Sequence, residues 1–108
     1  MTKISHNLIM NSLEELKAVD TKILSLKDIS SFTDIMIITS GTSSRHMSAI
    51  SDKIQENLKE KSISIISVEG KGSSEWVLLD LGDIVVNIMS KSARELYDLE
   101  SLWDPDLL

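Results

Sequence analysis

Carboxylates beside predicted strands are the residues of this chain that could do metal chemistry. Asp80 and Asp83 flank a turn, and Asp34 and Glu69 adjoin two other apolar runs. Carboxylate oxygens are the ligands that magnesium prefers, so a magnesium-dependent, nucleotidyltransferase-like enzyme that uses Asp80 and Asp83 is one hypothesis. No Asp-x-Asp pair follows a Gly-Ser turn, however, and we expect turn and strand-edge roles for these acids. We therefore predict no catalytic residue, no metal site and no cofactor.

The stretch SGTSSRH, residues 40–46, could bind an anion. Gly41 follows an apolar run, and Thr42 and Ser43 are residue types that favour helix N-caps. Free N–H groups at a helix start can hold a phosphate, with Arg45 assisting. The spacing matches neither a Walker loop nor a dinucleotide fingerprint. Ordinary capping by Thr42 or Ser43 is the simpler interpretation.

Histidine, cysteine and serine offer little more. His6 and His46 lie far apart without metal-ligand spacing, and we expect His46 to be a surface or cap residue. Cysteine is absent, which excludes a thiol nucleophile, thiolate metal sites and a disulfide scaffold. No serine lies in a nucleophile-elbow sequence.

A predicted hairpin over residues 76–89 combines an aliphatic face with a mixed one. Period-two alternation places Trp76, Leu78 and Asp80 together, and Asn87 of the second strand falls on the same side. A dry core rarely accepts such polar groups without partners. The mixed face is therefore either a docking surface centred on Trp76, or a sheet edge that Trp76 covers while Asp80 caps the turn.

The C-terminal segment places aromatic residues among acids. Tyr97 and Trp103 are surrounded by Glu95, Asp98, Glu100, Asp104 and Asp106. Aromatic anchors dominate interface energetics, and complementary charge sets encounter and register. This composition favours docking onto a basic protein surface, although a solvated acidic terminal helix would have the same pattern.

Helical spacing predicts a helix over residues 92–101. Leu96, Leu99 and either Leu102 or Trp103 recur at about helical spacing, so part of this segment should pack on the domain. We expect Arg94 to form a structural ion pair, with Asp98 four residues on. Residues 103–108, with Pro105, form a predicted irregular tail.

Composition limits the class of protein. The 108 residues suit a single domain, and the net charge of −6 with a pI near 4.8 disfavours direct nucleic-acid binding and favours a basic partner. No run approaches the roughly 20 apolar residues that a membrane span needs, and the N-terminus has no signal-peptide pattern. We expect a cytoplasmic protein without membrane contact.

The remaining elements form an α/β pattern. Helices are predicted over 6–19 and from the SGTSSRH stretch to about Lys61, and strands over 21–27, 34–39, 63–68, 76–81 and 83–89. The strand–helix–strand succession predicts two parallel strands with a right-handed crossover. The fold class is α/β, a mixed sheet of about five strands flanked by helices. Its exposed hairpin edge could also pair with a second copy, so a homodimer of the free protein is a further hypothesis.

Several segments together resemble the ribosomal silencing factor family, RsfS, also called Iojap. They are TDIMIITSGTSSRHMSAI, VEG, EWVLLDLGDIVVNIM and ARELYDLESLW, in order and without a large insertion, and the similarity runs from about Leu8 to Trp103. The resemblance implies a nucleotidyltransferase-like topology without catalytic activity. It also implies binding to the large ribosomal subunit through its basic fourteenth protein. Occupying that face would block subunit joining and repress translation when nutrients are scarce.

The resemblance also nominates site residues. The predicted partner-binding residues are Trp76, Leu78, Asp80, Asp83, Arg94, Tyr97, Glu100 and Trp103. Other positions that match the family pattern are Asp34, Gly41, Ser43, Glu69, Gly70, Leu99 and Leu102. The chain departs from the family at Asn87, where histidine is usual. Asn87 keeps hydrogen-bonding capacity but has no titratable charge.

Overall fold

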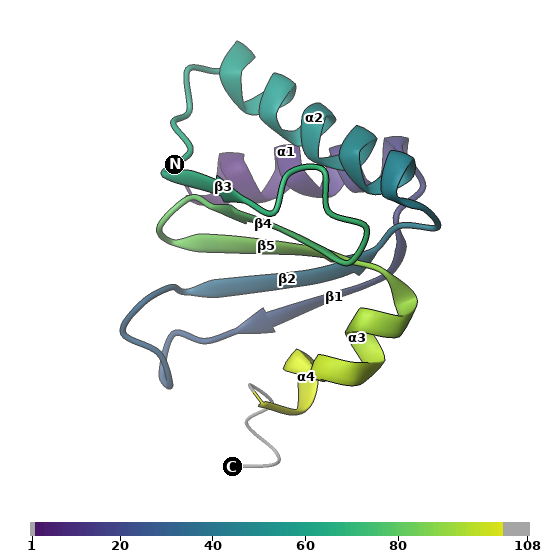
Figure 1. Ribbon diagram of the computed structural model, residues 1–108. Coiled ribbons are helices and arrows are strands. Elements are labelled where there is room, and N and C mark those ends of the chain that lie inside the picture. Colours follow the sequence, from purple (N-terminus) through teal and green to yellow (C-terminus); the bar gives the residue numbers. More distant parts are fainter. Residues whose placement is uncertain (1, 103–108) are drawn as a thin grey trace.

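The computed structural model describes residues 2–102 and contains a twisted five-stranded sheet with helices on both faces (Figure 1). The strands are β1 (Val19–Ser25), β2 (Ile35–Ser40), β3 (Ser67–Glu69), β4 (Trp76–Asp80) and β5 (Ile84–Met89), in the spatial order β1-β2-β5-β4-β3. The helices are α1 (Thr2–Glu15), α2 (Ser44–Glu60), α3 (Lys91–Tyr97) and α4 (Leu99–Leu102). The predicted mixed α/β class is confirmed.

The two central strands are parallel, and the others pair antiparallel. β2 and β5 run side by side with Ile37 opposite Val86, while β4 and β5 form the predicted hairpin with Leu79 opposite the same Val86. β-branched residues dominate β2 and β5 and are mostly buried, as expected for strands covered on both faces.

Helices α1 and α2 cover one face, which we call the closed face (Figure 1). α2 begins after the predicted N-cap Ser43, whose hydroxyl accepts a hydrogen bond from the His46 N–H. The buried stripe of α2 consists of Met47, Ile50, Ile54 and Leu58. The sheet residues of the same core cluster are Ile37, Val77, Leu79, Ile84, Val86 and Ile88. These positions confirm the predicted helix stripe and the aliphatic face of the hairpin.

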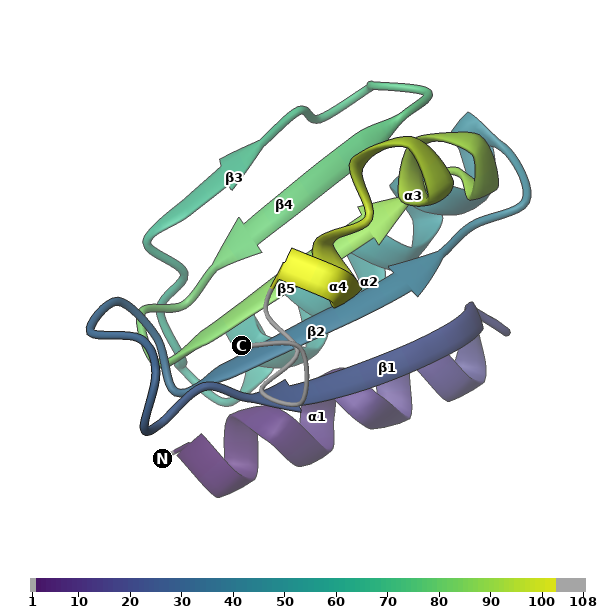
Figure 2. The same ribbon diagram turned by 90° about the horizontal axis from the view of Figure 1, so that it is seen from below.

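Helices α3 and α4 lie on the opposite face (Figure 2). A smaller buried cluster holds them there: Leu24, Leu26, Ile38, Met89 and Ala93, with Met36, Trp76 and Leu99 packed against it. In Figure 2 these short helices lie over β5 and β2 and do not reach β3. Within residues 2–102, part of this face therefore has no helix above it, and we call this side of the sheet the half-open face.

The single helix predicted over residues 92–101 is wrong, because the segment forms two short helices. Asp98 adopts a left-handed conformation with φ of 45°, which ends α3 and separates it from α4. The change of direction breaks the helical spacing of the leucines. Leu99 packs inward, as the prediction that part of this segment packs on the domain requires, whereas Leu96 and Leu102 are exposed.

The predicted strand over 63–68 shrinks to Ser67–Glu69. The first residues of the predicted strand belong to the turn that ends α2. In this turn Ser62 has φ of 57°, and the Ile63 N–H donates to the Leu58 carbonyl. β3 runs in the same direction as β2, because it is antiparallel to β4, which is antiparallel to β5. The predicted parallel orientation therefore holds, but β5 and β4 lie between the two strands.

The first predicted helix is displaced toward the N-terminus. It ends at Glu15 rather than residue 19 because Lys17 takes a left-handed conformation, and the Ala18 N–H closes the turn onto the Leu13 carbonyl. β1 then starts at Val19, two residues before the predicted strand over 21–27.

Candidate docking surface

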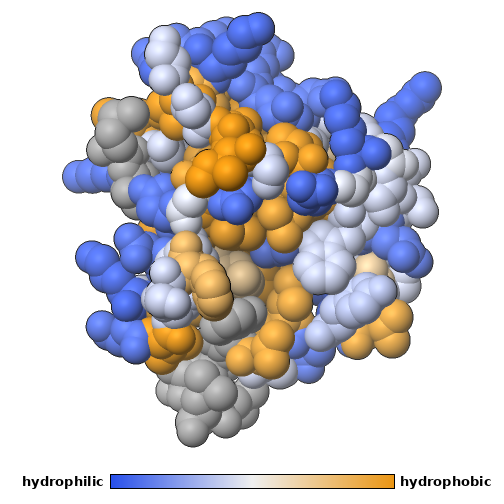
Figure 3. All heavy atoms as spheres, turned by 60° about the vertical axis from the view of Figure 1, so that its left-hand side comes forward, coloured by the Kyte–Doolittle hydropathy of each residue, from blue (hydrophilic) through white to orange (hydrophobic). Residues whose placement is uncertain are grey.

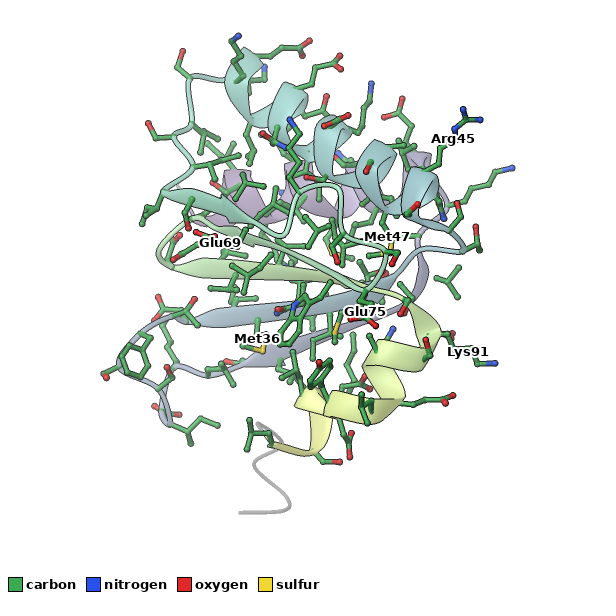
Figure 4. All side chains as sticks on the ribbon, viewed as in Figure 1. Met36, Arg45, Met47, Glu69, Glu75 and Lys91 are labelled. Atoms are coloured by element: carbon green, nitrogen blue, oxygen red, sulfur yellow. The ribbon has the colours of Figure 1, made fainter. Side chains whose placement is uncertain are left out.

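The half-open face carries a row of partly exposed side chains. Trp76, Leu78 and Asp80 of β4 alternate outward from the closed core, and the pairing register places Val85 of β5 and Met36 of β2 beside them. All five are intermediate in exposure, and Figure 4 shows Met36 below the sheet. The structure thus brings three predicted site residues onto one face and adds Met36 and Val85, which the parallel register of β2 and β5 selects.

Trp76 is held from two sides. Its ring lies 5.2 Å from that of Tyr97, centroid to centroid, with an interplanar angle of 43°. Its indole Nε1–H donates to Asn87 Oδ1 at 2.9 Å. Tilted aromatic pairs of this kind add to the stability that burial alone provides. The predicted anchors Trp76 and Tyr97, which come from different elements, therefore form one aromatic unit.

Asn87 is almost fully buried, with 1% of its surface exposed. Its oxygen receives the Trp76 bond, but Nδ2 has no hydrogen-bond partner within the described residues. Because a buried donor without a partner costs about 1–3 kcal/mol, this side chain stabilises the core poorly. Its evident contribution is to fix the orientation of Trp76.

The loop before β4 fixes the backbone of Trp76. The Ser73 hydroxyl accepts hydrogen bonds from the Glu75 and Trp76 N–H groups. Gly70 has φ of 76°, and a Cβ placed on it would lie 2.2 Å from the Trp76 carbonyl oxygen. The glycine that the family motif nominates therefore permits a close approach between this loop and the start of β4.

Asp80 and Asp83 shape the turn of the hairpin. Asp80 Oδ1 accepts a hydrogen bond from the Gly82 N–H at 2.8 Å, which confirms the turn role expected for Asp80. The Asp83 carbonyl accepts from the N–H groups of Asp34 and Ile35, at 3.0 Å each. These bonds fix the turn against the start of β2.

Arg94 connects the C-terminal helices to the sheet. Its Nε lies 2.6 Å from Glu100 Oε1, and its Nη1 donates to Ser40 Oγ at 3.1 Å. The predicted ion pair with Asp98 is wrong, because the left-handed Asp98 brings α4 back toward Arg94 instead. Arg94 and Glu100, both predicted to bind the partner, neutralise each other and hold α4 in place. Trp103 lies outside the described residues.

A groove of about 1140 Å³ lies at the carboxyl ends of β2 and β5, where residues 40–46 meet the start of α3. Its lining includes hydroxyls and two cations, Lys91 and Arg94, but four acids: Asp20, Glu95, Asp98 and Glu100. Figure 4 shows Arg45 pointing outward from α2, and it does not line the groove. The interpretation of residues 40–46 as an ordinary capped helix start therefore fits better than a phosphate site.

His46 has a structural role that its position in the sequence did not reveal. Its Nδ1 accepts from the Thr42 N–H at 2.9 Å, so the proton resides on Nε2, which lies 2.6 Å from the Leu16 carbonyl oxygen. The side chain thus links the end of α1 to the start of α2. Within residues 2–102, no three His, Cys, Asp or Glu side chains gather closely enough to hold a metal ion.

Sequence comparisons identify relatives of this chain. The family model described as ribosomal silencing factor during starvation, RsfS, matches residues 2–106. A relative from Haemophilus influenzae named ribosomal silencing factor RsfS is 41% identical over 95 residues, which cover 88% of this chain and 93% of the relative. A mouse relative named mitochondrial assembly of ribosomal large subunit protein 1 is 32% identical, over 94% of this chain and 46% of its own length.

A solved structure shares the fold. The crystal structure of a Chromobacterium violaceum protein superimposes with a TM-score of 0.89 at 37% identity, and the match covers 94% of this chain and 84% of that one. In the part of the chain that the structure describes, no helix has the length and apolar character of a membrane span.

Proposed function

The chain belongs to the ribosomal silencing factor family, RsfS, and on this premise we propose that it binds the large ribosomal subunit through a basic ribosomal protein. The resemblance points to the fourteenth protein of that subunit. Bound there, the chain would occupy the surface that the small subunit needs, and would repress translation when nutrients are limited. The family description names starvation, and the mouse relative's name refers to the large subunit. A bacterial-type ribosomal partner would place the protein in the cytoplasm.

The observation that carries the proposal is the half-open face. A Trp–Tyr pair stands beside apolar side chains of β2, β4 and β5, and Asp80 and Glu69 lie on the same side of the sheet. A partly desolvated aromatic centre with a charged rim is the usual anatomy of a protein interface. With a net charge of −6, the chain complements a basic surface.

Each predicted site residue has a distinct role in this proposal. Trp76 and Tyr97 are the anchors, and Leu78 extends the apolar floor between them and the hairpin turn. Asp80 and Asp83 contribute negative potential that speeds encounter and sets orientation. The Arg94–Glu100 pair positions α4 beside the anchors and need not touch the partner. Trp103 remains a proposed contact on the strength of the family motif.

The mechanism is steric and involves no catalysis. The protein needs affinity for one subunit and enough bulk to exclude the other, so no bond is made or broken. Regulation then depends on the amount of protein relative to free large subunits, since repression follows occupancy. Self-association of the free protein would compete with this binding if it covered the half-open face.

Co-sedimentation with isolated ribosomal subunits tests the proposal. We expect the wild-type protein to pellet with large subunits and not with small ones. Trp76→Ala should weaken this binding by about 2 kcal/mol or more, because it removes a central aromatic anchor. Ile4→Ala is a matched control, since Ile4 is an exposed hydrophobic residue on α1, away from the half-open face. Wild-type affinity for the Trp76→Ala variant would remove Trp76 from its role.

A further inference from the structure

The most exposed large hydrophobic side chain among residues 2–102 is Phe32, of which 85% is accessible. It lies in the loop between β1 and β2. An aromatic ring left in water gains nothing from folding. Exposed aromatic side chains are enriched at protein interfaces, so Phe32 is a candidate contact residue.

The loop holds Phe32 in place. The Ser30 hydroxyl accepts hydrogen bonds from the N–H groups of Phe32, at 3.0 Å, and Thr33, at 3.4 Å. The base of the loop is closed by the Leu26 N–H, which donates to the Asp34 carbonyl at 2.7 Å. The backbone that carries Phe32 is therefore ordered, so the entropy cost of ordering this backbone is largely paid before a partner arrives.

The same loop is fastened to the β4–β5 turn. The Asp34 and Ile35 N–H groups both donate to the Asp83 carbonyl. Ile66, which is 68% exposed, also lies next to this turn. A Cβ placed on Gly82 would lie 3.2 Å from the Cδ1 atom of Ile66. Phe32 and Ile66 thus come from loops that adjoin one turn.

Three acidic residues lie in the segments that connect Phe32 with Ile66. Backbone groups of Asp34 and Asp83 join the Phe32 loop to the turn, and the Asp80 side chain caps the turn. We call Phe32, Ile66, Asp34, Asp80 and Asp83 the turn-end patch. Figure 3 faces this end of the molecule and shows apolar surface interrupted by charged groups.

We propose that the basic partner also contacts the turn-end patch, so that the interface continues from the half-open face around the β4–β5 turn to Phe32 and Ile66. Asp80 belongs to both surfaces and makes them continuous. Arginine and lysine suit such a patch, because their aliphatic stems cover apolar side chains while their charged ends meet carboxylates. This inference rests on the proposed function, since it adds contacts for the same partner.

A second copy of the chain fits the patch less well. A symmetric contact would place the same acids of two copies near one another, and like charges brought together at an interface are costly. A cationic partner has no such conflict.

The test compares Phe32→Ser and Ile66→Ser with Ile4→Ser in co-sedimentation with large subunits over a range of protein concentrations. Ile4 is 51% exposed and lies on α1, outside both surfaces. Light scattering of the free proteins and thermal unfolding complete the set. Because Phe32 is so exposed, its replacement should not change the melting temperature. We expect each patch variant to bind about tenfold more weakly than wild type, with Ile4→Ser unchanged.

The outcomes separate this inference from the proposed function. If wild type binds large subunits and both patch variants bind equally well, the turn-end patch makes no contact, and the proposed function stands. If wild type does not bind large subunits, both proposals are overturned. If wild type is a dimer and Phe32→Ser is a monomer with unweakened subunit binding, the patch joins copies of this chain, which also overturns the inference.

Discussion

The two faces of the sheet are built from the same strands but differ in how far their side chains are buried. Under α1 and α2 most of the residues facing the helices are aliphatic and buried. On the other face, β4 presents Trp76, Leu78 and Asp80, which remain partly exposed beside two short helices. Because alternate side chains of a strand point to opposite sides, β4 can contribute to stability with one set and to binding with the other.

Buried polar groups differ between the faces in the same way. On the closed face the Ser12 hydroxyl accepts a hydrogen bond from Asn57 Nδ2 and donates one to the Leu8 carbonyl, so this buried hydroxyl has a partner both as donor and as acceptor. On the half-open face Asn87 Nδ2 has no partner among the described residues. Selection for stability alone would favour the first arrangement. The second is understandable if Asn87 serves to orient Trp76.

Core truncation should give the largest contrast between the faces. Ile54→Ala on the closed face should lower the free energy of unfolding by about 2–5 kcal/mol, since Ile54 is fully buried. Leu78→Ala, at a partly exposed site, should cost less stability but weaken subunit binding. Urea denaturation and co-sedimentation measure the two effects. Equal losses of stability would contradict the division between the faces.

The glycines of the loop before β4 allow a sharper test. Gly70 and Gly72 both have positive φ, but a Cβ on Gly70 meets the Trp76 carbonyl, whereas one on Gly72 meets nothing within 4 Å. Gly72→Ala should cost roughly 1 kcal/mol for its backbone conformation, and Gly70→Ala should cost more and displace Trp76. Urea denaturation and tryptophan fluorescence would show the difference. Matching effects of the two substitutions would mean that the close approach is unimportant.

The smallest effect on stability is expected at Asn87. Asn87→Leu removes one hydrogen bond to Trp76, worth about 0.5–1.5 kcal/mol, and also removes the unpartnered donor. The free energy of unfolding should therefore change by less than about 1 kcal/mol, while Trp76 loses its fixed orientation and binding weakens. Asn87→His, which introduces the residue expected at this position from the resemblance to the family, is the control that should keep binding. A large loss of stability for Asn87→Leu would show that the residue is mainly structural.

Regular patterns predicted the fold well, and local backbone turns limited the rest. The alternation in residues 76–89 and the helical stripe of α2 gave correct faces, because burial imposes those periods. Left-handed residues such as Lys17 and Asp98 have no periodic signature, so the helix ends and the Arg94–Glu100 pair were missed. The pairing of Trp76 with Tyr97 joins two elements far apart in the sequence and required the structure.

Phe32 illustrates a different limit. A lone aromatic residue in a loop has no period, and its sequence context does not distinguish a buried ring from an exposed one. Its exposure and its link to the β4–β5 turn emerge from hydrogen bonds between segments far apart in the chain. Sequence predicted the pairing of β4 with β5, but not the other strand pairings and not which loops would share a surface.

The most direct test of the central claim is a subunit-joining assay with purified components. Large subunits are incubated with increasing amounts of the protein before small subunits are added, and joined ribosomes are measured by sedimentation. We expect joining to fall as the protein saturates the large subunits, and Trp76→Ala to shift this curve to higher concentrations. Unchanged joining at saturation of the large subunits would mean that the protein does not act by steric exclusion.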